Sequence, residues 1–142
     1  MLIGTYEHNM DAKKRVIMPA KFREDIGDKF YLTVGFDGCI RAYSTEQWKV
    51  YISRYDNLPE SNENARRIRR IILANSSECE VDKQGRIIIP PNLLKHANLV
   101  KETVIIGQSA HIEIWAKEIW DAYQPEEDNL NELIGSLSEF GL

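Results

Sequence analysis

An internal repeat constrains the fold of this chain more than any other feature of its sequence. Displaced by 71 residues, YEHNMDAKKRVIMPAKF (6–22) aligns with SECEVDKQGRIIIPPNL (77–93), and displaced by 72 residues, LTVGFDGCIRAYSTEQW (32–48) aligns with VIIGQSAHIEIWAKEIW (104–120). The matched pairs include Asp11 and Asp82, Arg15 and Arg86, Pro19 and Pro90, Gly35 and Gly107, and Trp48 and Trp120. We therefore expect two copies of one structural unit, each of about 45 residues.

Each copy has the sequence pattern of a small β-β-α-β-β unit. β-prone stretches lie on both sides of each D-x-x-x-R element, so the element itself is predicted to be a hairpin connection. Proline then ends the strand, and PAKFREDI (19–26) and PPNLLKHA (90–97) have the apolar spacing of short helices. FYLTVGFDGCIRAY (30–43) and TVIIGQSAHIEIW (103–115) each predict two further strands around a turn. Units this small bury little apolar surface alone, so we expect the copies to share one core or to exchange elements.

The rest of the sequence predicts helices. Between the copies, Trp48, Tyr51, Ile52 and Tyr55 recur at helical spacing, and Ile68, Ile71 and Ile72 do so again after Pro59, with Ser61 or Asn62 as the candidate N-cap. AKEIWDAY (116–123) is predicted to be helical, and the acidic tail after it to be disordered or to dock on a neighbour. We divide the chain into a first repeat (1–50), a helical linker (51–75), a second repeat (76–120) and an acidic C-terminal tail (121–142).

Charge is segregated along the chain. The formal net charge is −4, but the seven acidic residues after Lys117 are joined by no Lys or Arg, so residues 1–117 are net positive. Between Met10 and Arg23, five basic residues face only Asp11. A phosphate backbone responds to this local field and not to the net charge of the whole chain. A nucleic-acid partner is therefore compatible with a sequence pI of about 5.4.

Several functional classes receive no support from the sequence. No apolar run approaches the roughly 18 residues of a membrane span, and Glu7 and Asp11 lie where a signal peptide would be apolar, so we expect no membrane association and a cytoplasmic location. Cys39 and Cys79 have neither CxxC spacing nor the density of a disulfide scaffold, and we expect both to be reduced. No Cys or His pair has zinc-like spacing, so we expect no metal and no other cofactor.

An enzyme is not expected either. The nucleotide-binding and hydrolase motifs GxxxxGK[ST], GxGxxG, GxSxG and HExxH do not occur. Asp11 and Asp82 could be imagined as a carboxylate pair, but each has its own Arg to satisfy, which would keep its pKa low and make it a poor acid at neutral pH. We therefore expect no catalytic residues and no small-molecule substrate.

The D-x-x-x-R element, DAKKR at 11–15 and DKQGR at 82–86, is the strongest candidate for a functional site. Its Asp can accept hydrogen bonds from turn amides and from the guanidinium, which would orient the Arg. An oriented Arg can pair with O6 and N7 of guanine in the major groove, while Lys13, Lys14 and Lys83 could reach phosphates. In isolation such an element is more commonly a surface ion pair of little energetic value. The repetition and the local charge favour DNA contact by the first copy, whereas for the second a structural role is an equal alternative.

The other basic clusters and the tryptophans have simpler structural explanations. Arg66, Arg67, Arg69 and Arg70 could follow a phosphate backbone, but such a run on a helix is more often a solvated face or a subunit interface, with Glu60 and Glu63 one turn away as partners. Trp48, Trp115 and Trp120 recur at matching places in the copies, as core residues do, and lack the interleaved basic residues of a stacking platform for single strands.

On these residues the chain resembles the MraZ family of bacterial transcriptional regulators, which are associated with the division and cell wall gene cluster. That family belongs to the AbrB-like class of swapped-hairpin DNA-binding proteins. The resemblance covers nearly the whole chain and rests on Asp11 with Arg15 and Asp82 with Arg86, each followed by three apolar residues and a proline, and on the opening MLIGTYEHNMDAKKRVIMPAKFR.

The resemblance implies an α+β fold: a tandem repeat of two β-rich AbrB-like swapped-hairpin units that share one pseudo-twofold barrel core, with linker and C-terminal helices. It also implies a nucleoid-associated repressor, a ring-shaped homo-oligomer that binds double-stranded DNA at short G-containing direct repeats in the promoter of its own operon. Lys13, Lys14 and Arg15 would read the DNA, with Lys83 and Arg86 as the second-copy counterparts and Asp11 and Asp82 orienting the arginines. The alternative is a protein-interaction module of the antitoxin-like swapped-hairpin type.

Overall fold

The computed structural model of the protein describes residues 1–125 and 129–142. Both repeats form the expected β-β-α-β-β unit. The first repeat contains β1 (Thr5–Asn9), β2 (Arg15–Ile17), α1 (Ala20–Ile26), β3 (Lys29–Val34) and β4 (Ile40–Ser44). The second contains β5 (Ser77–Glu80), β6 (Arg86–Ile88), α4 (Pro91–His96), β7 (Glu102–Gly107) and β8 (Ile112–Ala116).

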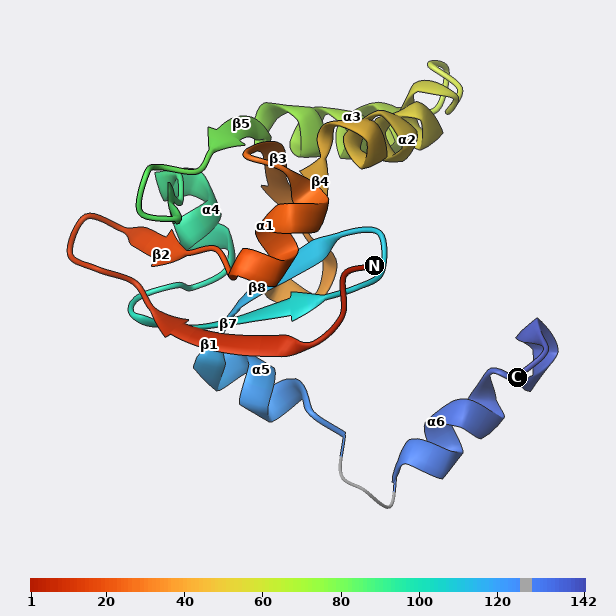
Figure 1. Ribbon diagram of the computed structural model, residues 1–142. Helices are drawn as coiled ribbons and strands as arrows, with labels where there is room; N and C mark the ends of the chain where they lie inside the picture. Colours follow the sequence, from red (N-terminus) through yellow and green to blue (C-terminus); the bar gives the residue numbers. More distant parts are fainter. Residues whose placement is uncertain (126–128) are drawn as a thin grey trace.

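The strands are shared between the repeats in a pseudo-twofold arrangement (Figure 1). Six strands form one antiparallel sheet in the order β1-β7-β8-β4-β3-β5, and β2 and β6 form a separate two-stranded ribbon. When the corresponding strands of the two repeats are exchanged, the same sheet order is read in reverse. The pseudo-twofold axis therefore passes between β4 and β8 and between β2 and β6. Each repeat gives its first strand to the other, because β1 pairs with β7 and β5 pairs with β3.

The hairpin expected at each D-x-x-x-R element is confirmed at the turn and wrong along the strands. The Asp11 amide donates to the Arg15 carbonyl at 2.9 Å and closes the turn. Beyond the turn, β2 pairs with β6 instead of β1, with Arg15 opposite Ile88 and Ile17 opposite Arg86. A three-residue strand has only one inward-facing side chain to bury, and pairing across the repeats brings the inward Val16 and Ile87 into one common core.

That core is built from both repeats, as their small size predicted. Its buried side chains come from the ribbon, from α1 and α4, and from the inner face of the sheet. Phe22 and Leu93, the matching residues of α1 and α4, are both buried in it. Since neither half encloses these side chains alone, the two repeats form one folding unit.

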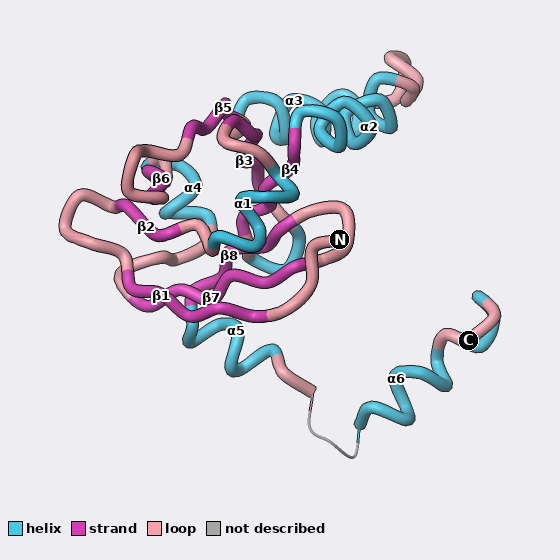
Figure 2. The backbone as a smooth tube through the Cα atoms, in the orientation of Figure 1, coloured by secondary structure: helices cyan, strands magenta, loops and turns pink. Residues whose placement is uncertain are grey.

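Two helices lie between the repeats, α2 (Thr45–Asp56), which begins before the linker predicted at 51–75, and α3 (Glu63–Ala74), and they pack over β3 and β4 (Figure 2). The side chain of Asn62, one of the two predicted N-cap candidates, accepts a hydrogen bond from the Ala65 amide at 3.0 Å and caps α3. Tyr51 and Ile72 are buried between the helices and the sheet, but Ile71 is 51% exposed, so its assignment to the apolar face of α3 was wrong.

The C-terminal region begins with α5 (Lys117–Tyr123), which packs on β7 and β8. The tail then continues as α6 (Leu130–Ser136) and a 3-10 turn at Ser138–Phe140, and α6 projects away from the sheet in Figure 1. Residues 126–128 of the acidic tail lie outside the described residues. None of the helices that the structure describes is long and apolar enough to span a bilayer.

The tryptophans pack into the hydrophobic clusters, as expected. Trp115 is buried beside Cys39, and Trp120 packs against the same cluster. Trp48 of α2 packs against Tyr43 and Tyr51.

Candidate nucleic-acid interface

The first D-x-x-x-R turn is organised by the Asp11 carboxylate. Oδ1 accepts hydrogen bonds from the amides of Lys13 and Arg15, both at 3.0 Å. Oδ2 accepts one from the Arg15 Nε at 2.7 Å. The backbone closes the same loop, because the Lys14 amide donates to the Asp11 carbonyl at 3.1 Å. The carboxylate thus fixes both the turn and the direction in which the arginine leaves it.

The second turn repeats this geometry bond for bond. Oδ1 of Asp82 accepts from the amides of Gln84 and Arg86 at 2.8 and 2.9 Å, and Oδ2 accepts from the Arg86 Nε at 2.9 Å. The Gly85 amide donates to the Asp82 carbonyl at 3.0 Å. The sequence repeat is therefore a repeat of an Asp-ordered turn that presents an arginine.

The same hydrogen bonds set the electrostatics of the two carboxylates. The amide of Arg15 and, in the second turn, the amide of Arg86 are the largest causes that lower the pKa of Asp11 and of Asp82 below its ordinary value. Both aspartates are therefore ionised at neutral pH and act as fixed acceptors. This agrees with the expectation that neither serves as a catalytic acid.

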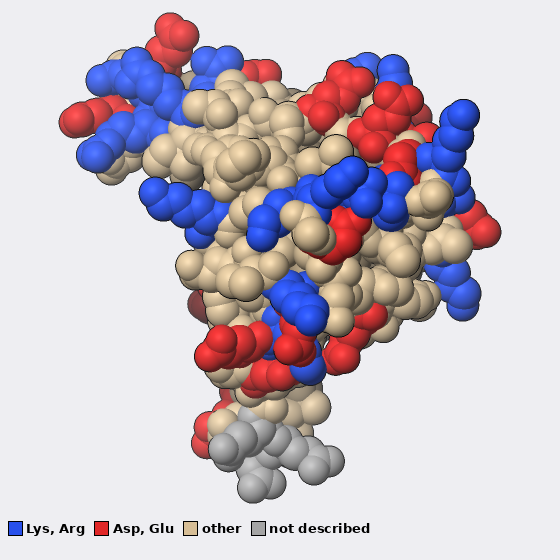
Figure 3. Space-filling view, turned by 90° about the vertical axis from the view of Figure 1, so that its left-hand side faces the viewer, with Lys and Arg blue, Asp and Glu red and all other residues tan. Residues whose placement is uncertain are grey.

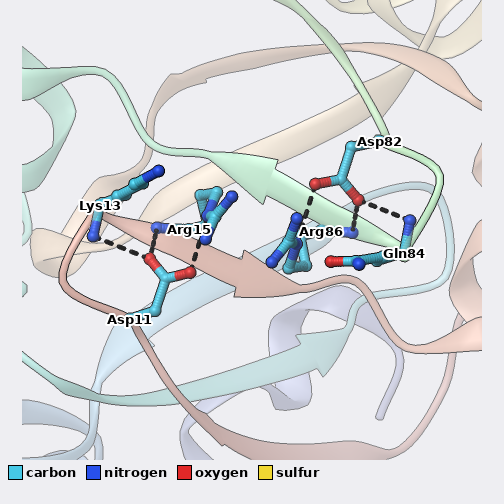
Figure 4. Close-up of polar contacts among 6 residues, drawn as sticks. All are labelled: Asp11, Lys13, Arg15, Asp82, Gln84 and Arg86. Atoms are coloured by element: carbon cyan, nitrogen blue, oxygen red, sulfur yellow. Dashed lines mark hydrogen bonds and ion pairs between the residues drawn. The ribbon is translucent and has the colours of Figure 1, made fainter.

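Both arginines lie on the outer face of the β2–β6 ribbon. Figure 4 shows the two Asp–Arg pairs side by side, with each Asp at the outside and Arg15 and Arg86 next to each other toward the middle. Val16 and Ile87 point inward, so the residues on either side of them point outward. Ile17 and Ile88, which are 45% and 62% exposed, complete this outer face. The ribbon thus presents two arginines and two isoleucines in a pseudo-twofold pattern.

The Asp contacts leave the tips of the arginines available. Each carboxylate binds the Nε of its arginine, and within residues 1–125 and 129–142 the Nη groups of Arg15 and Arg86 have no hydrogen-bond partner. The two Nη groups of a guanidinium are the donors that can pair with two adjacent acceptors of a base. The turn therefore holds each arginine from one side and presents a two-donor edge on the other.

The two turns differ at the residue before the arginine. The backbone of Lys14 has a φ of 62° and that of Gly85 a φ of 79°, so both adopt the left-handed conformation. Glycine adopts it freely, whereas a lysine there is strained. The second turn has the residue that suits the backbone, and the first turn has a charged residue in its place.

A further basic residue, Arg23 of α1, lies against the second turn. A Cβ placed on Gly85 would come within 2.6 Å of the Arg23 Nη1 atom, which shows how closely the guanidinium approaches this turn. In the sequence, Arg23 belongs to the basic segment around the first turn. Its position could not be predicted from sequence spacing, because it depends on the strand exchange that brings α1 next to β6.

The face that carries the two turns has a distinct charge pattern. Lys and Arg side chains form a band across the middle of this face, while Asp and Glu gather below it and also above it, at the upper right (Figure 3). On α5, Lys117 pairs with both Glu7 and Asp121. Basic side chains are thus concentrated where the ribbon presents its arginines.

The arginines of α3 lie on the linker and not on this ribbon. Arg69 pairs with Asp56 of α2 at 2.7 Å, and Arg66 donates to the backbone carbonyl of Glu60 at 2.8 Å. The expected pairing with the carboxylates of Glu60 and Glu63 was therefore wrong. The intervening loop turns the Glu60 carbonyl toward α3, and Asp56 reaches across from the neighbouring helix.

Metal ligands do not gather in the described part of the chain. No three His, Cys, Asp or Glu side chains there could share one ion. Cys39 and Cys79 are buried free thiols, and burial raises the pKa of Cys39 to about 12 and that of Cys79 to about 11. Neither thiol is a nucleophile at neutral pH.

Comparison with known proteins identifies the family. A family model described as "MraZ protein, putative antitoxin-like" matches the chain twice, at residues 1–71 and 72–133. A protein named transcriptional regulator MraZ from Thermoanaerobacter sp. (strain X514) is 51% identical over 128 residues, 90% of each chain. Proteins of the same name from Thermoanaerobacter pseudethanolicus and Clostridium acetobutylicum are 47% and 43% identical over the full length of both chains. With a tandem match of the family model and relatives this similar from end to end, the chain belongs to the MraZ family.

Proposed function

We propose that this protein is a sequence-specific DNA-binding repressor that binds short direct repeats upstream of its own division and cell wall operon. Its relatives carry the name of transcriptional regulators, which supports regulation of transcription and not catalysis as its role. On this proposal the protein acts in the cytoplasm, associated with the nucleoid.

One observation carries the proposal: Arg15 and Arg86 lie next to each other on the outer face of a two-stranded ribbon, each held through Nε by its own aspartate. The major groove of B-DNA admits a two-stranded β-ribbon. A guanidinium held through Nε keeps both Nη groups for O6 and N7 of a guanine. Because Asp11 and Asp82 fix the arginines before DNA arrives, little side-chain entropy is lost on binding.

The lysines of the turns have a second role. Lys13 and Lys14 in the first turn and Lys83 in the second are exposed beside the arginines. A lysine ammonium on a flexible stem suits phosphates, which position the protein without reading sequence. Arg15 and Arg86 would thus specify bases, while Lys13, Lys14 and Lys83 would supply affinity that depends on salt.

A single ribbon reads only a few base pairs, so we also propose that several copies act together as a ring-shaped homo-oligomer. Copies joined in one assembly meet successive direct repeats at a high effective concentration. Weak contacts by each ribbon then add up to tight binding. This explains how an acidic protein with a small basic face could regulate a promoter.

The proposal is tested by titrating the wild type and Arg15→Ala against the upstream DNA of its own operon and against a scrambled duplex, at two salt concentrations. The wild type should bind the native repeats more tightly than the scrambled duplex, with an affinity that falls as salt rises. Arg15→Ala should lose most of that preference. Arg54→Ala on α2 is the matched control, since it also removes one arginine, at an exposed position away from the ribbon.

The same titration separates the proposal from the second candidate, an antitoxin-like protein-interaction module, which the description of the family model favours. Equal and weak binding of both duplexes by all three proteins would make the D-x-x-x-R turns structural. Binding to a protein partner that persists in high salt would then support the second candidate.

A further inference from the structure

Residues 129–142 of the tail carry an apolar stripe over which none of the other described residues packs. Along α6 and at its C-cap, Leu130, Leu133, Ile134 and Leu137 recur at the spacing of one helix face, and they are between 40% and 52% exposed. A helix of seven residues is only marginally stable in isolation. The helical conformation of α6 and its uncovered stripe indicate a segment that is stabilised by docking on another surface.

A groove at the other end of the molecule has complementary chemistry. It lies between α2 and α3, has a volume of about 700 Å³, and is lined by Leu58, Leu73 and Tyr55 together with three arginines, Arg66, Arg69 and Arg70. Leu58 and Leu73 are 39% and 41% exposed. Apolar floors of this kind, flanked by charge, accept amphipathic helices.

The charges of the two surfaces are opposite. Asp56 already pairs with Arg69, and Glu60 also lines the groove, but within the described residues neither Arg66 nor Arg70 has a carboxylate partner. The tail after Pro125 contains five acidic residues and no Lys or Arg. These are Glu126, Glu127, Asp128, Glu132 and Glu139.

We infer that the tail of one copy docks in the α2–α3 groove of a second copy of this chain, with the α6 stripe on Leu58 and Leu73 and with Glu132 and Glu139 facing Arg66 and Arg70. This contact would join neighbouring copies in the homo-oligomer proposed above. The inference rests on the proposed function only in that it takes this homo-oligomer as given.

A neighbouring copy is the occupant because the groove of the same chain is too far away. α5, where the tail begins, lies under β1 and β7, whereas α2 and α3 lie at the opposite end of the sheet in Figures 1 and 2. A compact chain of this length is about 37 Å across. The residues between Tyr123 and Leu130 span at most about 25 Å when fully extended. In an assembly of like copies, the groove of a neighbour can come within that reach.

The test measures the mass of the assembly against protein concentration, without DNA, by light scattering after size exclusion. Removing residues 126–142 should raise the dissociation constant between copies by about a hundredfold, as for the loss of a central apolar anchor. Arg66→Glu with Arg70→Glu reverses the charge of the groove, and Glu132→Lys with Glu139→Lys reverses the charge of the tail. Each pair of substitutions should raise the dissociation constant between copies by about tenfold.

Two matched controls accompany these variants. Arg67→Glu changes the charge of α3 outside the groove lining, and Asn131→Asp adds a charge to α6 off its apolar stripe, so each should change the dissociation constant by less than about twofold. Leu133→Asp, on the stripe, should match the effect of removing the tail.

Mixing the two reversed proteins distinguishes docking between copies from docking within one chain. The acidic groove of one protein then meets the basic tail of the other, and the basic groove meets the acidic tail, so association should return to near the wild-type strength. Failure of the mixture to associate, together with restored association when all four substitutions are combined in one chain, would place the tail in its own groove and overturn the inference. An unchanged mass after removal of the tail, or a wild type that is monomeric at all concentrations, would overturn it as well.

The test of tail docking and the test of the proposed function give independent results. The tail and groove variants leave Lys13, Lys14 and Arg15 intact, so their affinity for a duplex with a single repeat should equal that of the wild type. Loss of single-repeat binding in Arg15→Ala tests the ribbon, whereas the change in mass tests the tail.

Discussion

The turn of the first repeat, residues 11–15, and that of the second, residues 82–86, hold an arginine with the same three carboxylate hydrogen bonds and differ in the charge around them. At the left-handed position before the arginine, the first turn has Lys14 and the second has Gly85. The two turns thus share the Asp and the left-handed backbone at this position, although the residue there differs.

This difference shows where conformational strain is tolerated. A non-glycine residue in the left-handed conformation costs free energy, and such residues persist where their side chain is used. Lys14 adds a cation at the tip of the first turn. At the second turn, glycine leaves room for Arg23, whose guanidinium supplies a cation from α1 instead. Each turn therefore has an additional cation beside it, Lys14 in the first turn and Arg23 at the second.

The largest effect is expected from comparing Arg86→Ala with Arg15→Ala. Each should lose a bidentate contact to a base, which costs about 1–3 kcal/mol of binding free energy for each ribbon and relaxes specificity. If both turns enter the groove, as their position side by side on one face suggests, the two losses should be similar. The measurement is the ratio of affinities for native and scrambled duplexes.

An unequal result would restrict the interface to one turn. Wild-type binding by Arg86→Ala, with strong loss in Arg15→Ala, would make the second turn structural. Arg54→Ala again serves as the control for the loss of one positive charge.

Exchanging the residues at the left-handed position should give effects of opposite sign on stability. Lys14→Gly should increase the free energy of unfolding by about 1 kcal/mol, because it removes the strain of a lysine at this φ. Gly85→Lys should decrease the free energy of unfolding by about 1–2 kcal/mol, since the new Cβ is strained and must displace Arg23. Denaturant unfolding of both variants measures the two changes.

The role of Lys14 in the first turn can also be measured through DNA binding. Lys14→Gly should weaken binding about equally for all sequences and reduce the slope of log affinity against log salt by about 1 for each ribbon, as for the loss of one phosphate contact. A Lys14→Gly protein that is less stable than the wild type would show that Lys14 is not strained. One with an unchanged salt slope would show that Lys14 does not touch phosphate.

The sequence predicted most of this architecture because the repeat fixed the order of elements. Asp11, Arg15 and Pro19 with their counterparts marked the turns and the strand ends, and the N-cap of α3 was narrowed to Ser61 or Asn62. The pairing of β2 with β6 did not follow from pattern alone, since three-residue strands carry too little information to specify a partner. The position of Arg23 against Gly85 depends on that pairing, so it was missed for the same reason.

The smallest effect concerns pH. Hydrogen bonds from backbone amides are the largest cause of the lowered pKa in both aspartates, and these bonds are the same in the two turns. Asp11 and Asp82 should therefore titrate alike despite the different charges nearby, each with a midpoint below the ordinary 3.8. Because the folded pKa is lowered, the contribution of each carboxylate to stability is fully present above the unfolded pKa and is lost as pH falls through the folded one.

The side-chain carboxyl signals of the two aspartates, followed by NMR against pH, measure the midpoints, with a DAKKR peptide as the unfolded reference. Since both groups are exposed, solvent screening keeps the contribution to stability small. A midpoint for Asp11 clearly below that of Asp82 would show that Lys13 and Lys14, and not the shared amide bonds, control the first carboxylate. The two turns would then differ in their electrostatics as well as in their sequence, and the first turn alone would be adapted to a polyanion.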